Sequence, residues 1–80
     1  MEAVDTLFRG SNRELALMVV ETIHGLSEYW PLTVRQVYYQ LVAALAIQNA
    51  LGEHKRILKM VITLRRESLL PWEAVEVRTR

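Results

Sequence analysis

The segment Pro31–Leu45, which reads PLTVRQVYYQLVAAL, constrains the fold more than any other part of the chain. Thr33 and Gln36 are spaced as a capping box, in which each side chain accepts a hydrogen bond from the backbone N–H of the other residue. A helix is therefore predicted to begin here and to end near Ala46. One face of this helix is committed to a core, because apolar side chains recur along it at helical spacing: Val34, Val37, Tyr38, Leu41, Val42 and Leu45.

Arg35 and Tyr39 lie one turn apart at the edge of that apolar face. At about 100° per residue they share one flank of the helix, whereas Tyr38 falls within the apolar stripe and is expected in the core. A guanidinium binds phosphate oxygens through paired hydrogen bonds, and a phenol adds a hydroxyl donor and a stacking surface. The pair is thus a candidate phosphate contact, although the spacing of Tyr39 fits a plain rim position equally well.

A second helix with two unlike sides is predicted over about Glu53–Glu67. Its apolar side carries Ile57, Leu58, Met60, Val61 and Leu64. The opposite arc carries Lys55, Arg56, Lys59, Thr63 and Arg66. Such an arc is usually a solvated face, but here acids stand only at its two ends. We therefore expect these residues to bind DNA, with this helix as the recognition helix of a helix-turn-helix.

The remaining segments complete the predicted fold. Residues 1–10 are expected to form an N-terminal arm, either loose or a short helical turn, and residues 11–80 a single winged-helix-like domain. Its first helix is predicted to begin at a second capping box, formed by Ser11 and Glu14. The fold class is mainly α, a three-helix helix-turn-helix core with a short C-terminal strand or wing.

That last strand is predicted from the alternation that follows Pro71, since proline ends the preceding helix. Trp72, which comes directly after this proline, is expected to pack on the helices.

Composition narrows the classes of function. The 80 residues include no cysteine, which excludes a disulfide framework and a thiolate zinc site. His24 and His54 lie on different predicted helices without paired carboxylates, so we expect no metal site and no cofactor. No apolar run approaches the roughly 20 residues of a membrane span, and the N-terminus lacks a basic signal region. The chain is expected to be soluble and cytoplasmic.

The charges are unevenly distributed along the chain. Residues 1–32 carry five acids and two arginines, whereas residues 33–66 carry six lysines and arginines and a single acid, Glu53. This asymmetry indicates a polyanionic partner on one side of the domain.

Residues 29–80 resemble the N-terminal winged-helix segment of proteins similar to the A subunit of topoisomerase VI, especially short versions encoded by phages and plasmids. The family motif R-(D/Q)-x-Y-Y corresponds to residues 35–39, and its second tyrosine, the one that cleaves DNA in that family, is Tyr39 here. The resemblance continues through Asn49, Lys55-Arg56, Arg65-Arg66, Pro71-Trp72-Glu73 and Arg78-Thr79-Arg80. The chain departs from the family at Ala44-Leu45, His54 and Val77. It also stops where relatives continue into a metal-binding TOPRIM domain, and the resemblance implies a bacterial host cell.

These observations predict double-stranded DNA binding without intrinsic cleavage. A phenol is a weak nucleophile at neutral pH, and cleavage of a phosphodiester would need the metal that a TOPRIM domain supplies in the resembling family. Tyr39 is therefore a catalytic residue by resemblance only, which requires a TOPRIM-containing partner. The alternative is a small mobile-element module that binds or blocks a host nucleic-acid-binding protein, which the acidic first helix favours. The oligomeric state is left open.

Overall fold

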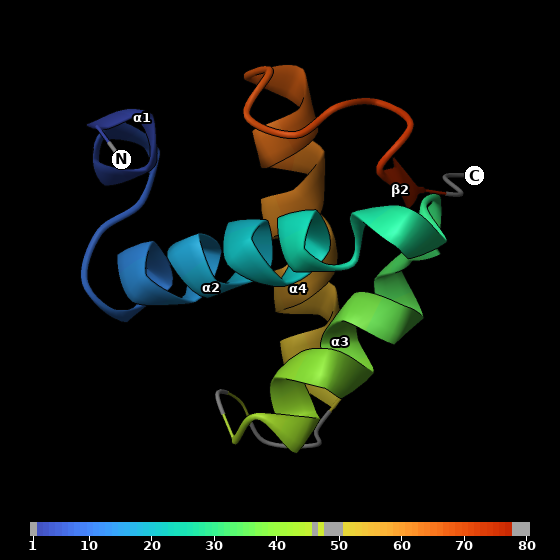
Figure 1. Cartoon of the computed structure of the whole chain (residues 1–80). Helices are drawn as coiled ribbons and strands as arrows, with labels where there is room; N and C mark the ends of the chain where they lie inside the picture. The colour runs from blue at the N-terminus through green and yellow to red at the C-terminus, as the bar shows by residue number, and fades with distance from the viewer. Residues whose placement is uncertain (1, 46, 48–50, 78–80) are drawn as a thin grey trace.

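The computed structural model of the chain describes residues 2–45, 47 and 51–77. Within these residues three main helices cross one another, accompanied by a short N-terminal helix and two very short strands (Figure 1). The elements in chain order are α1 (Glu2–Leu7), α2 (Ser11–Gly25), the 3-10 turn η1 (Ser27–Tyr29), β1 (Leu32–Thr33), α3 (Val34–Ala43), α4 (Leu51–Arg66) and β2 (Val75–Glu76). The prediction of a small, mainly α domain is confirmed.

The N-terminal segment forms the helix α1, which packs against α2. Val4 of α1 is fully buried in the core. Asp5 forms an ion pair with Arg13 of α2, with 2.9 Å between Oδ1 and Nη1. Both a buried apolar side chain and an ion pair therefore join the N-terminal helix to the rest of the domain.

Helix α2 begins differently from the prediction. The expected capping box of Ser11 and Glu14 is wrong, because Gly10 is the N-cap residue and no side chain caps this end. Gly10 has a φ of 60°, a left-handed conformation that glycine adopts without the steric cost of a Cβ atom. Ser11 consequently lies inside the first turn, and its hydroxyl accepts a hydrogen bond from Arg56 of α4 instead.

Helix α3 begins as predicted. The Thr33 hydroxyl accepts a hydrogen bond from the backbone N–H of Gln36 at 3.0 Å, and the Gln36 side chain accepts one from the Thr33 N–H at 2.8 Å. The helix ends at Ala43, earlier than the predicted end. Leu45, which was assigned to the apolar face, is 90% exposed because it lies beyond the end of the helix, with a left-handed φ of 59°.

The predicted C-terminal strand exists as β2, and its partner is the strand β1 just before α3. The two strands run parallel, with Leu32 opposite Val75 and Thr33 opposite Glu76. The Leu32 N–H also donates to the Ala74 carbonyl at 2.9 Å. The segment that follows α4 is thereby fixed beside the start of α3, as Figure 1 shows.

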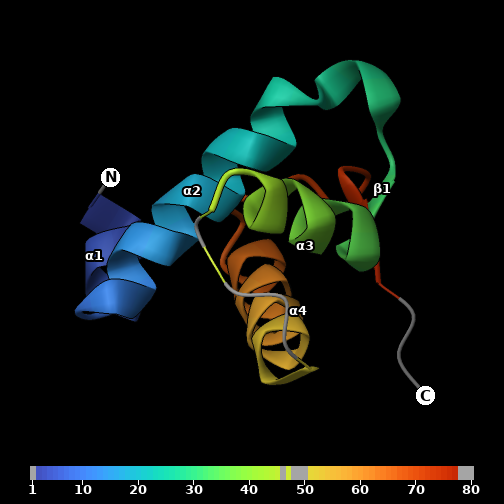
Figure 2. The same ribbon diagram turned by 90° about the horizontal axis from the view of Figure 1, so that it is seen from below.

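The core lies where the three main helices meet. Figure 1 shows α2 crossing α4, and Figure 2 looks nearly along the axis of α4, with α2 and α3 on one side of it. Each helix contributes one apolar side, and residues 70, 74 and 75 close the core from the C-terminal segment. The fully or nearly fully buried side chains include Leu15, Val19, Ile23, Leu32, Val37, Tyr38, Leu41, Ile57, Met60, Val61, Leu64, Leu70 and Val75.

Candidate nucleic-acid interface

Helix α4 has the two sides that its sequence predicts. Its buried side carries Ile57, Met60, Val61 and Leu64, and Leu58 is half-buried. The opposite side exposes Lys55, Lys59 and Arg66. We call these three residues the α4 ridge. Their separations of four and seven residues keep them on one side of the helix, over an axial length of roughly 16 Å.

The structure gives the α4 ridge no carboxylate partner within the described residues. The acid on α4, Glu53, accepts a hydrogen bond from Arg56 at 3.3 Å. Ile62 and Thr63, next to the ridge, are half-buried. The ridge therefore presents three positive charges to solvent without an acid between them.

Arg56 has a different role from the one predicted for the basic arc. Its Nε and Nη2 atoms both donate to the Asn12 carboxamide oxygen, and Nη2 also donates to the Ser11 hydroxyl at 3.4 Å. With Glu53 as a third acceptor, its guanidinium joins the start of α2 to the start of α4. Arg56 therefore differs from the other cations of the predicted basic arc, because its side chain is half-buried and its guanidinium makes four hydrogen bonds within the protein.

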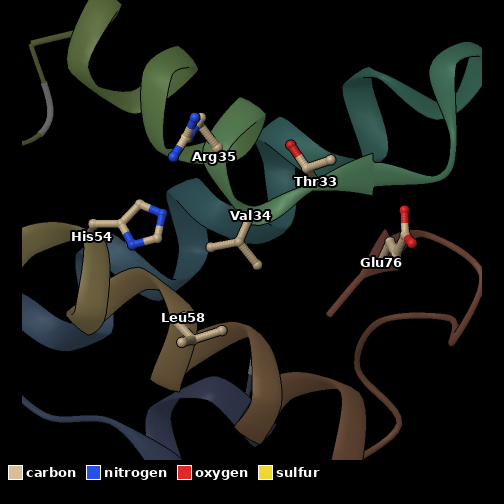
Figure 3. Close-up of a pocket in the computed structure, with 6 residues that line it drawn as sticks. All are labelled: Thr33, Val34, Arg35, His54, Leu58 and Glu76. Carbon is tan, nitrogen blue, oxygen red and sulfur yellow. The ribbon is translucent and has the colours of Figure 1, made fainter. Parts of the chain in front are cut away.

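Arg35 and Tyr39 are both exposed on α3, as their off-stripe positions predict, but they line different hollows. Arg35 lines a hollow of about 550 Å³ between α3, α4 and β2. Figure 3 shows its guanidinium on the same side of this hollow as the His54 ring, with Glu76 on the opposite side. Tyr39, which is 55% exposed, instead lines a hollow of about 430 Å³ together with Tyr29. The structure therefore does not bring the two side chains into one pocket.

Tyr38 is the structural member of the tyrosine pair. It is 5% exposed, and the His54 ring packs edge-on against it with 5.3 Å between ring centroids. The Tyr39 ring lies 5.5 Å from it in a tilted arrangement. Tyr38 thus joins α3 to α4 through its contact with His54, and it also packs against the ring of Tyr39. The contact of His54 with this pair was not predicted, since single-sequence spacing does not show which residues face each other across two helices.

Arg65 and Trp72 form a contact that the sequence did not predict. The Arg65 Cζ atom lies 4.3 Å from the centroid of the Trp72 ring, and Nη2 donates to the Trp72 carbonyl at 3.5 Å. Trp72 is 66% exposed, so the expectation that it packs on the helices is wrong. The indole stacks on a guanidinium at the surface, a cation–π arrangement that leaves the rest of the ring in solvent.

Two further features of the described residues bear on the chemistry. They contain no group of three or more His, Cys, Asp or Glu side chains placed to hold a metal ion. None of the described helices is long and apolar enough to cross a membrane.

No family model, curated protein or solved structure matches the chain. The resemblance to the A subunit of topoisomerase VI, including the catalytic assignment of Tyr39, stays a prediction. The function of the chain is therefore inferred from its own residues and their arrangement.

Proposed function

We propose that this chain binds double-stranded DNA through the exposed side of α4. The observation that carries the proposal is the α4 ridge, in which Lys55, Lys59 and Arg66 point away from a buried apolar side with no acid between them. A polyanion with regularly spaced charges can neutralise such a row of cations. Each phosphate that a lysine or arginine neutralises releases condensed counterions, which favours binding. The major groove is wide enough to admit a helix of this kind.

Arg35 supports the proposal from the neighbouring helix. It lines the hollow beside α4 and is exposed, so it extends the positive surface from α4 toward the start of α3. Glu76 on the opposite side of that hollow limits where an anion can enter. We infer that Arg35 contacts a backbone phosphate beside the groove, while Tyr39, one turn further along, contributes at most a weak hydroxyl contact.

The arrangement of elements is compatible with a helix-turn-helix in which α3 precedes the recognition helix α4. Helix α3 ends at Ala43 and α4 is described from Leu51, so the predicted turn at residues 48–52 lies mostly outside the described residues. The strand β2 pairs in parallel with β1, whereas a wing in the usual sense is an antiparallel hairpin. We therefore propose a variant of the motif and rest the DNA-binding proposal on the α4 ridge.

The proposal is tested by titrating duplex DNA of random sequence at several salt concentrations. Replacing Lys59 and Arg66 together with alanine should lower the slope of log affinity against log salt by up to about 1.8, because each lost phosphate contact removes about 0.9. The matched control replaces Arg9 and Arg13 with alanine, which removes the same charge from the exposed α1–α2 region. An equal loss in both double variants would show that net charge, and not the α4 ridge, governs binding.

A second candidate function is supported by the other hollow. Exposed tyrosines 29 and 39 line it together with Leu26 and Leu32, and the acidic Glu28 precedes Tyr29 in η1. This aromatic surface suits a protein partner, as expected for a module that binds a host nucleic-acid-binding protein. Duplex binding that is absent, or that does not depend on salt, would favour this function. Cleavage of DNA through Tyr39 would in either case require a partner with a metal-binding TOPRIM domain.

A further inference from the structure

A hollow of about 340 Å³ at the C-terminal end of α4 combines an open aromatic ring with two arginines. Its volume falls at the lower end of the range of small-ligand pockets. Arg65 and Arg66 come from the last turn of α4, and Trp72 comes from the segment beyond it. Ile62 and Val77 supply the apolar part of the lining. Every charged group that lines this hollow is cationic, so its chemistry suits an anion that carries a flat apolar part.

The indole of Trp72 is held in place from one side. The Arg65 guanidinium lies over the ring at 4.3 Å and donates to the carbonyl of the same tryptophan, so both ends of the contact are fixed. The tryptophan remains 66% exposed, which leaves its other face open to a ligand. A ring fixed before binding loses little conformational freedom when a second ring stacks on it.

In the part of the chain that the structure describes, the positive charges of the two arginines are not neutralised by an acid, although the Arg65 guanidinium already covers one face of Trp72. Within the described residues neither has a carboxylate partner, and the Nε of Arg65 is buried without a hydrogen-bond partner. Arg66 is exposed and is also the last member of the α4 ridge. Because Arg66 belongs to both the α4 ridge and this hollow, a DNA strand that lies along the ridge would end beside Trp72.

We propose that this hollow binds an unpaired nucleotide, with the base stacked on Trp72 and its phosphate on Arg66. The inference rests on the proposed binding of DNA along α4, and it adds a preference for duplexes with a single-stranded end. A base pair inside the duplex has both faces covered by its neighbours in the stack, whereas an unpaired base can turn a face to the indole. An acidic peptide without aromatic residues would neutralise the arginines but would offer no ring to stack on Trp72.

The test compares three DNAs of the same duplex sequence: one blunt, one with a short thymidine overhang, and one with an abasic overhang of equal length. The overhang with bases should bind about tenfold more tightly than the abasic overhang, the effect that one base–aromatic stack carries. Trp72→Ala should abolish this difference, and Trp72→Phe should retain part of it. Both variants should keep the helical circular dichroism of the wild-type chain, because this side chain is outside the core.

Fluorescence provides an independent readout. In a Trp30→Phe variant Trp72 is the only indole, and a short oligothymidylate should quench its emission whereas the abasic oligomer should not. Equal affinity for the two overhangs would overturn the inference, while salt-dependent blunt-duplex binding would still support the proposed function. Base-dependent quenching without binding of duplex DNA would support the nucleotide site at Trp72 and would refute the proposed binding of duplex DNA along α4. Equal quenching by a peptide of alternating glutamate and tyrosine would identify a protein-docking site and overturn the nucleotide assignment.

Discussion

Replacing Arg56 with methionine separates a structural cation from a DNA-binding one. The variant keeps most of the apolar stem and removes the guanidinium that bonds Asn12, Ser11 and Glu53. Hydrogen bonds to charged groups contribute about 1.5–3 kcal/mol, but exposed ion pairs contribute only about 0.2–1 kcal/mol. Since the contacts to Asn12 and Ser11 are exposed, we expect a loss of about 1 kcal/mol in the free energy of unfolding.

For a domain of this size, such a loss corresponds to a fall of about 4–8 °C in the melting temperature, measured by circular dichroism. The salt slope of DNA binding should change little, because the Arg56 donors already bond within the protein. The matched control is Lys59→Met, which removes a charge from the same helix at an exposed position. It should lower the salt slope by about 0.9 and leave stability within about 0.5 kcal/mol. The reasoning is refuted if Arg56→Met lowers the slope as much as the control does at an unchanged melting temperature.

The two tyrosines and Arg35 give two further predictions. Tyr38→Ala should lower the free energy of unfolding by about 3 kcal/mol or more, because it empties a buried aromatic site between α3 and α4; an unchanged thermal transition would contradict this. In DNA titrations Arg35→Ala should weaken binding more than Tyr39→Phe, since a guanidinium–phosphate contact is stronger than one from a neutral hydroxyl, and the reverse ranking would remove Arg35 from the interface.

The sequence predicted the elements whose causes are local. The capping box of Thr33 and Gln36 needs only two side chains three residues apart, and both of its hydrogen bonds are present. The two-sided character of α4 likewise follows from the helical period alone. Exposure of Tyr39 and burial of Tyr38 were predicted for the same reason, because adjacent helical residues point in directions about 100° apart.

Features that depend on backbone conformation or on distant partners were missed. Gly10 and Leu45 have positive φ values, and they lie at the start of α2 and just beyond the end of α3. Apolar spacing continues through such positions and does not show them. The pairing of β1 with β2 joins residues more than forty positions apart, so the alternation that predicted β2 did not show which segment it pairs with.

Trp72 was placed wrongly for a related reason. Its neighbours Leu70 and Ala74 are both buried and already close the core at this end of α4. The turn between them directs the intervening indole outward, where the Arg65 guanidinium covers one face of it. The position of Trp72 after Pro71 predicted that it packs on the helices, but position along the chain does not show which way a turn directs a side chain.

The same contacts limit how strongly DNA binding can depend on salt. Residues 33–66 carry six lysines and arginines, but Arg56 is bonded to α2 and Arg65 is stacked on Trp72. Four cations of this region remain exposed: Arg35, Lys55, Lys59 and Arg66. At about 0.9 per neutralised phosphate, their combined contribution to the salt slope is at most about 3.6, whereas all six would give about 5.4. Measuring the salt slopes of the wild-type chain and of Arg56→Met distinguishes these two upper limits. A wild-type slope near the higher limit that falls when Arg56 is replaced would mean that the hydrogen bonds from Arg56 to Asn12 break when DNA binds.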